Sequence, residues 1–337
     1  MIKDAIDALA RGSDLNASLM SSVMEEIMIG KAATADIVDF LIKLDKKGET
    51  VEELVAAVLV LRRYAAAIDV KAAHVLDTCG TGGDTKGTFN ISTAVAFVAS
   101  GAGISVAKHG NRSVSSQSGS ADVLEELGIN IRLTPEKIKE CLEKTGIAFL
   151  FAPDLHPAMK YAMPARKEIG KRTIFNILGP LSNPAKAAHQ LVGVYDKRWV
   201  PVLAQVLLEL GSKHALVVHG EDGLDEISTV SPSYVSEACQ GKVINYKLNP
   251  RDFGIKKARL EELRGGDAKK NAAIIIDILK GKKSPCRDIV VLNAAAAIYS
   301  ADAAVSIKEG LLLAEQSIDN LKALEKLELL KQFTKNG

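Results

Sequence analysis

One stretch, residues 75–128, constrains the fold of this chain more than any other part of it. It begins VLDTCGTGGDTKGTFNIST, in which a short apolar run is followed by four glycines set among threonines. Glycines allow positive φ angles and close backbone approach, so that successive N–H groups can converge on an anion. An apolar segment then opens at Asn90 and predicts a helix whose positive N-terminal end faces the same loop. This pattern indicates a phosphate site between a strand and a helix.

The second half of the stretch, KHGNRSVSSQSGSADVLEELG, repeats this arrangement with side chains. The run GISVA predicts a short buried strand that ends at Lys108, and a helical pattern closes at Gly128. Lysine and arginine supply cations for phosphate oxygens, and the serines between them add hydroxyl donors. Either turn alone could be only a tight turn, and neither matches GxGxxG or GxxxxGK[ST]. Two such turns in succession favour a ligand with more than one phosphate.

From residue 73 onward, short apolar runs alternate with helical patterns. The predicted strands are residues 75–76, 104–107, 147–151, 189–194 and 215–218, and the predicted helices are 93–100, 120–127, 135–145, 199–210 and 289–300. Such alternation predicts an α/β fold with a mostly parallel central sheet flanked by helices. Ligands of such sheets bind beyond the carboxyl ends of the strands. After Val230 the pattern indicates loop and edge strand.

The first 70 residues predict a small all-helical domain. Helical patterns cover residues 15–28, then 35–44 with Thr34 as N-cap, then 51–64 opened by a Thr50–Glu53 capping box. Their apolar faces exceed what so short a segment can bury, which favours packing against the remainder or against a second copy. We therefore expect a helical domain at 1–70 and an α/β domain at 71–337, with part of 164–188 packing near the helical one.

Composition excludes several classes of partner and site. Lys and Arg number 43 against 41 Asp and Glu, which gives no basis for binding nucleic acid or an anionic membrane. The four cysteines lack CxxC spacing, which argues against a disulfide framework or a thiolate metal site. The N-terminus lacks a secretory apolar segment, so we expect a cytoplasmic protein. Residues 289–307 are apolar but interrupted by Asn293, Ser300, Asp302 and Ser306, which indicates a buried helix and no membrane span.

Two further segments carry charge. The run ALVVHG is followed by EDGLDEIS, which places Asp225 and Glu226 just past a predicted strand. Oxygen ligands without His or Cys suit Mg²⁺, although a solvated acidic turn has the same composition. Arg166 lies in PARKEIGKRTIFNILGPLSNPA, where a basic run could bind an anion or only solvate a helix face.

Together these segments resemble a known family. DTCGTGGD, FNIST, KHGNRSVSSQSGSADVLEELG and NILGPLSNPA are similar to the signature segments of the anthranilate phosphoribosyltransferases of tryptophan biosynthesis, most densely between residues 77 and 226. The resemblance implies a nucleoside phosphorylase/phosphoribosyltransferase-like fold, a homodimer formed through the helical domain, and Mg²⁺ as cofactor. It also implies transfer of 5-phosphoribose from 5-phosphoribosyl-1-diphosphate to the amine of anthranilate, with release of diphosphate.

The resemblance further implies roles for individual residues. The matching positions for the diphosphate sugar are Gly80, Gly83, Asp84, Thr88, Asn90, Ile91, Ser92, Thr93, Lys108, His109, Gly110, Asn111, Arg112, Ser113, Val114, Ser115, Ser116 and Ser120. Those for anthranilate are Gly80, His109, Asn111 and Arg166, and those for the metal are Ser92, Asp225 and Glu226. No protein nucleophile is implied, because Lys108 and the metal would stabilise the leaving diphosphate.

Two other functions fit the same architecture. A pyrimidine nucleoside phosphorylase shares a lysine-containing phosphate loop but attacks with phosphate and needs no magnesium; KHGNRSVSS and the Asp225–Glu226 pair argue against it. A non-catalytic nucleic-acid-binding relative would need clustered Lys and Arg along one surface. The near-neutral charge of this chain disfavours that second alternative.

Overall fold

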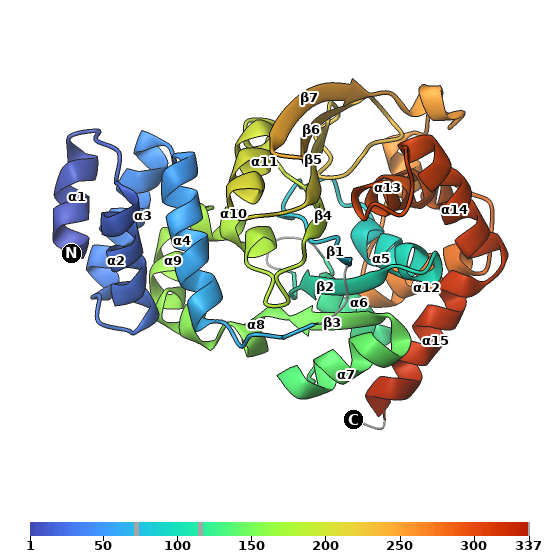
Figure 1. Ribbon diagram of the computed structural model, residues 1–337, viewed down its shortest axis with the longest axis horizontal. Helices are drawn as coiled ribbons and strands as arrows, with labels where there is room; N and C mark the ends of the chain where they lie inside the picture. Colours follow the sequence, from blue (N-terminus) through green and yellow to red (C-terminus); the bar gives the residue numbers. More distant parts are fainter. Residues whose placement is uncertain (71–73, 114–116, 336–337) are drawn as a thin grey trace. The chain divides into compact units, whose positions relative to one another are not determined.

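The computed structural model describes residues 1–70, 74–113 and 117–335, which form two compact units (Figure 1). The helical unit comprises Met1–Ala67 and Pro153–Pro184, and the α/β unit comprises Ile68–Ala152 and Ala185–Gly337. Sequence patterns placed residues 71–337 in the larger domain, with part of 164–188 packing near the helical one. In the structure the whole of 153–184 clusters with the helical unit, although it lies between two strands of the sheet in the chain.

The helical unit is built from pairs of helices that bury their apolar faces against one another. Its elements are α1 (Ile2–Ala10), α2 (Ala17–Met28), α3 (Thr34–Lys47), α4 (Val51–Tyr64), η1 (Pro157–Tyr161), α9 (Met163–Ile169) and α10 (Ile174–Leu181), and α8 (Ala152–Leu155) leads into its second segment. α2 packs on α4 and α1 on α3, while α9 contacts α3 and α10 contacts α4. The last pair is tied by Arg62, whose guanidinium donates to the Leu181 carbonyl at 2.8 and 3.0 Å.

The ends of these helices test two predicted caps. The Thr50–Glu53 capping box at the start of α4 is confirmed. The prediction of Thr34 as N-cap of α3 is wrong, because Thr34 is already the first helical residue and the extended Ala33 precedes it. Glu53 is buried as well as capping: its carboxylate also accepts from Leu15 N and Lys47 Nζ, both at 2.8 Å.

The α/β unit is organised around a seven-stranded sheet. In chain order the strands are β1 (Val75–Asp77), β2 (Ser105–Gly110), β3 (Ile147–Phe151), β4 (His189–Gly193), β5 (His214–Gly220), β6 (Ser233–Cys239) and β7 (Lys242–Leu248). Their spatial order is β3-β2-β1-β4-β5-β6-β7, with parallel pairing from β3 to β5 and antiparallel pairing beyond. The predicted mostly parallel sheet is confirmed. β6 was not predicted, because the irregular pattern after Val230 indicated only loop and one edge strand.

Helices cover both faces of this sheet. They are α5 (Ile91–Gly101), α6 (Ser120–Glu126), α7 (Pro135–Thr145), α11 (Trp199–Glu209), α12 (Ala268–Leu279), α13 (Pro285–Ser300), α14 (Ile307–Asp319) and α15 (Lys322–Lys335), with short turns η2 (Pro250–Phe253) and η3 (Leu260–Leu263). α11 and α13 lie on opposite sides of β5 (Figure 1). α5 packs against β2, α13 and α15 and is buried along most of its length. Among the described residues, no helix combines the length and apolarity that a membrane crossing requires.

The strand order determines where a ligand can enter the sheet. From β1 the chain proceeds outward to β2 and β3, then returns to β4 and proceeds the other way to β5. In sheets of this kind, ligands bind beyond the carboxyl ends of the strands at the point where the strand order reverses, which here lies between β1 and β4. The predicted phosphate-binding loop leaves β1 at this switch point.

Candidate active site

The end of β4 brings two of the predicted loops together. Thr81 N donates to the Gly193 carbonyl at 2.8 Å, which fixes the glycine-rich loop after β1. A Cβ atom added at Gly193 would lie 1.5 Å from the carbonyl oxygen of Asp225, in the loop after β5. Only glycine allows this approach of two backbones. Gly193 thus places the acidic segment beside the glycine-rich loop.

Lys108 supplies a buried positive charge between these loops. Lys108 is 4% exposed, and its side chain extends from β2 toward the loop after β1. Its Nζ donates to Ser92 Oγ at 3.2 Å and to Thr78 Oγ1 at 3.3 Å. Ser92 lies in the first turn of α5 together with Ile91 and Thr93, and the positive N-terminal end of the helix dipole favours an anion there. The lysine and the helix N-terminus therefore present positive charge to the same place.

Three carboxylates gather opposite this lysine. Asp225, Glu226 and Asp84 are half-buried residues whose carboxyl groups influence one another. Withdrawal from water, followed by the charge of Asp84, raises the pKa of Asp225 to about 8. Withdrawal from water and the charge of Asp225 raise the pKa of Glu226 well above its usual value, and the charge of Lys108 opposes this shift. Carboxylates held together against their repulsion are typical of a cation site.

The donor set also fits magnesium. Asp84 Oδ2 is buried, and no hydrogen-bond donor faces it within the described part of the chain. The other oxygens are the carboxylates of Asp225 and Glu226 and the hydroxyl of Ser92, with no nitrogen or sulfur ligand among them. Hard oxygen ligands of this kind suit Mg²⁺, which also retains waters and accepts phosphate oxygens.

Asp77, which sequence patterns did not single out, joins two of the loops. It is the last residue of β1 and is fully buried. Its Oδ1 accepts from Cys79 N at 3.0 Å and from His109 N at 3.1 Å, so one carboxylate fixes both the start of the glycine-rich loop and the end of β2. Burial, and then the charge of Asp77, raise the pKa of the Cys79 thiol, which stays protonated and is a poor nucleophile.

A second set of bonds holds the entrance to α5. Asn90 Nδ2 donates to the Ser118 carbonyl at 3.2 Å, and Asn90 Oδ1 accepts from Asn271 Nδ2 at 2.8 Å. Asn271 is buried in α12 and was not predicted from the sequence. Thr88, just before Asn90, forms an isolated β-bridge with Arg264. These contacts fix the side chain of Asn90 from two sides.

The segment after β2 is tied to the start of α6. The carbonyl of Asn111 accepts from Ser120 Oγ at 3.3 Å, and a Cβ at Gly110 would lie 2.4 Å from the same hydroxyl oxygen. The guanidinium of Arg112 pairs with Asp122 at 2.7 Å and with Glu125 at 2.6 Å, so carboxylates occupy the fork that was predicted to bind phosphate. Ser113 N donates to Asp122 Oδ2 at 3.3 Å. The predicted site residues Val114, Ser115 and Ser116 lie outside the described residues.

The predicted acceptor residues are divided between the two units. Arg166 lies in α9 of the helical unit, whereas Gly80, His109 and Asn111 belong to the α/β unit. The guanidinium of Arg166 lies over the ring of Phe175, 5.6 Å from its centroid, and burial lowers the pKa of Arg166. His109 is almost fully buried.

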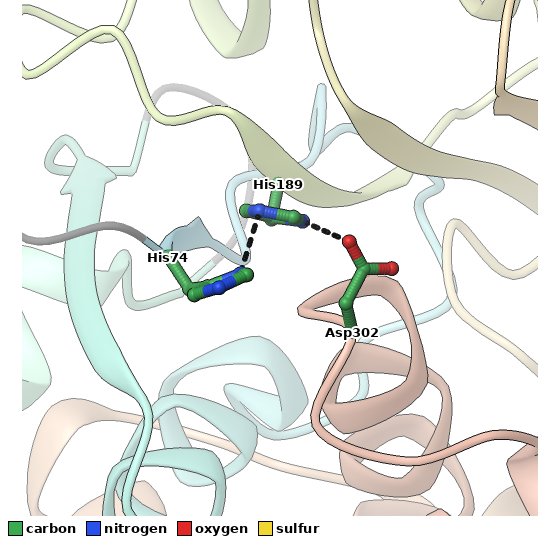
Figure 2. Close-up of side chains that lie close together, drawn as sticks. All are labelled: His74, His189 and Asp302. Carbon is green, nitrogen blue, oxygen red and sulfur yellow. Dashed lines mark hydrogen bonds and ion pairs between the residues drawn. The ribbon is translucent and has the colours of Figure 1, made fainter.

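A separate cluster lies at the amino ends of β1 and β4, the opposite edge of the sheet (Figure 2). His189 Nδ1 lies 2.7 Å from the Ser300 carbonyl oxygen, which can only accept, so Nδ1 carries the proton. His74 Nδ1 faces the other nitrogen of that ring, Nε2, at 3.3 Å, while Asp302 lies 3.9 Å from Nδ1. His74 and Asp302 therefore flank different edges of the His189 imidazole. We interpret the three as a polar cluster around His189, in which His74 is within hydrogen-bond distance and Asp302 forms a longer contact.

Comparison with known proteins agrees with this geometry. Residues 3–65 match the helical bundle domain of a glycosyl transferase family, and residues 72–324 match the a/b domain of such a family. The anthranilate phosphoribosyltransferase of Alkaliphilus metalliredigens is 53% identical over 330 residues, which are 98% of this chain and 97% of that protein.

Two solved structures extend the comparison to the fold. The anthranilate phosphoribosyltransferase of Thermus thermophilus has a TM-score of 0.94 at 40% identity and covers 98% of this chain and 99% of its own. The Saccharomyces cerevisiae enzyme in complex with PRPP and Mg has a TM-score of 0.91 at 27% identity, covering 100% of this chain and 98% of its own. This chain belongs to the anthranilate phosphoribosyltransferase family.

Proposed function

We propose that the protein transfers 5-phosphoribose from 5-phosphoribosyl-1-diphosphate to the amine of anthranilate, releasing diphosphate, as a step of tryptophan biosynthesis. One observation carries the proposal: a buried lysine, a helix N-terminus and three carboxylates gather beyond the carboxyl ends of the strands. A diphosphorylated sugar with its metal needs positive groups for the phosphates and carboxylates for the cation side by side.

We assign the metal position to Asp225, Glu226 and Ser92, with Asp84 beside them. The yeast relative, solved with PRPP and Mg, supports this choice of cofactor. Bound Mg²⁺ would neutralise charge that develops on the departing diphosphate. The shared negative charge of the carboxylates and the unsatisfied Asp84 Oδ2 support a cation here.

The residues of the chain would act mainly by binding and orienting the substrates. Lys108, the backbone of the glycine-rich loop and the first turn of α5 would hold the diphosphate and stabilise its charge as it leaves. An aromatic amine is uncharged at neutral pH and can attack the sugar without a strong base. The protonated Cys79 thiol is not suited to form a covalent intermediate, which supports direct transfer.

Arg166 is our candidate for binding the carboxylate of anthranilate, together with Gly80, His109 and Asn111. We expect Arg166→Ala to raise the KM for anthranilate about tenfold or more while changing the KM for the diphosphate sugar little, because a guanidinium–carboxylate pair is lost. Steady-state kinetics with each substrate varied in turn would measure this. An unchanged anthranilate KM would place the acceptor elsewhere.

We also propose that the protein is a cytoplasmic homodimer that associates through the helical unit. This unit exposes Ile29, Ile42 and Leu59 to 42%, 50% and 49% of their surface, and an interface that covered them would remove apolar surface from water. All four cysteines are free, which suits a reducing compartment. Sedimentation of the full chain and of Ile42→Asp would test the association: the wild type should sediment as a dimer and the variant should dissociate.

A coupled assay of phosphoribosylanthranilate formation tests the function. Product should form with both substrates and Mg²⁺, and chelation of the metal should abolish turnover. Phosphorolysis of pyrimidine nucleosides without metal would instead indicate the nucleoside phosphorylase alternative. Absence of both activities would leave the proposed function without support.

A further inference from the structure

Asn293 is a polar residue in α13, a helix of the α/β unit that is buried along most of its length. It lies in α13 between Leu292 and Ala294, and all three are fully buried. A primary amide withdrawn from water destabilises the fold unless its donors and acceptor are satisfied. The residue is therefore expected to have a specific partner, and the hydrogen bonds identify it.

The amide of Asn293 binds both backbone groups of one residue in the acidic loop. Its Oδ1 accepts from Ile227 N at 2.9 Å, and its Nδ2 donates to the Ile227 carbonyl at 2.8 Å. The second Nδ2 hydrogen goes to the Ile289 carbonyl of its own helix at 2.9 Å. Ile227 directly follows Glu226 in the chain. The side chain thus bonds this residue as a neighbouring strand would.

The other backbone hydrogen bonds within this loop lie before Asp225 or after Ile227. Before the acid pair, Gly220 N donates to the Leu224 carbonyl at 2.8 Å; after it, Ser228 N donates to Ser233 Oγ at 2.9 Å. The carbonyl of Asp225 rests against Gly193. The backbone of the acid pair is therefore held between Gly193 on one side and Asn293 on the other, while the N–H groups of Gly82 and Ser92 donate to the two carboxyl groups.

We propose that Asn293 is a positioning residue for the cation site, acting through Ile227 on the carboxylates of Asp225 and Glu226. The inference rests on the proposed metal-binding role of that pair. Carboxylates that repel one another outside water would separate if the backbone beneath them could move. Two hydrogen bonds from a helix packed in the core prevent that movement. A loss of such outer support commonly weakens metal affinity about 10- to 100-fold.

The test compares Asn293→Ala with Ser300→Ala in the full-length protein. Ser300 is the matched control, since it is equally buried in α13 but its hydroxyl donates only to Ala297 of the same helix. Amide hydrogen exchange of the peptide 220–230 would be measured without ligands. Mn²⁺ binding at saturating 5-phosphoribosyl-1-diphosphate would be followed by electron paramagnetic resonance.

We expect Asn293→Ala to accelerate exchange in that peptide and to weaken Mn²⁺ binding about tenfold or more, whereas Ser300→Ala should do neither even if both lower the melting temperature. Exchange and Mn²⁺ binding that match the control would overturn the proposal. Because hydrogen exchange requires no turnover, it tests the position of the loop even if the proposed transferase reaction is absent.

Discussion

Replacement of Asp225 by Asn together with Glu226 by Gln is expected to lower kcat about a thousandfold, since a bound metal contributes several kcal/mol to charge stabilisation and each ~1.4 kcal/mol is a factor of ten. The amides keep the shape of the carboxyl groups but lose the negative charge that holds a cation. The coupled assay at saturating substrates and magnesium measures the loss. Wild-type turnover by this double variant would remove the acid pair from the mechanism.

The same variant is expected to melt at a higher temperature than the wild type. In the folded protein the pKa of Asp225 is raised from 3.8 to about 8, so the folded state binds a proton more tightly than the unfolded state does. The free energy of unfolding therefore falls as pH rises between these two values. The amides of the double variant do not titrate, so the variant should not lose this stability. The gain in melting temperature should be larger at about pH 9 than at about pH 5.

Glu221→Gln is the control for both effects. Glu221 begins the same loop, but it is exposed and pairs with Lys247 at 2.6 Å on the surface. Its neutralisation should change neither kcat nor the pH dependence of the melting temperature, because surface ion pairs contribute little. A double variant that melts below the wild type at high pH would contradict the interpretation of the acid pair as a strained, charge-bearing site.

The sequence predicted the loops of the site, but it did not predict the distant residues that hold these loops in place. The loops after β1, β2 and β5 could be located because glycine, hydroxyl and acidic residues act locally, within a few positions of a strand end. Their supports bind across long distances in the chain: Asp77 to His109 over 32 residues, Asn293 to Ile227 over 66, and Asn271 to Asn90 over 181. The periodicity of apolar residues within a segment does not predict hydrogen bonds between segments that are far apart in the chain. Asn293 was visible only as an interruption of an apolar helix.

The same reason explains the differences in the fold. β6 combines buried positions with half-buried Tyr234, Glu237 and Cys239, so its sequence has no clear apolar run, and its pairing with β5 comes from the sheet. The helices of 153–184 belong with the helical unit because they pack on α3 and α4, which lie more than a hundred residues earlier in the chain. Local propensity does not indicate which of two cores a helix will cover.

Lys108→Met is expected to lower kcat/KM for the diphosphate sugar about a hundredfold, the usual loss when one buried donor to a developing negative charge is removed. Methionine fills similar space but leaves Ser92 and Thr78 without the cation that now contacts them at 3.2 and 3.3 Å. The charge of Lys108 also lowers the pKa of Glu226, so its removal should hold more of that carboxyl protonated and raise the Mg²⁺ concentration needed for half-maximal rate.

Lys47→Met separates this effect from the general consequences of deleting a buried lysine. The Lys47 side chain is 6% exposed, and its Nζ lies 2.8 Å from both Glu53 and Asp14 in the helical unit. Its loss leaves the buried Glu53 carboxylate without its cation, so the melting temperature should fall while kcat/KM stays near the wild-type value. Lys108→Met should show the reverse. Equal losses of activity in the two variants would mean that the effect of Lys108 arises from stability, and that its charge does not act on the diphosphate.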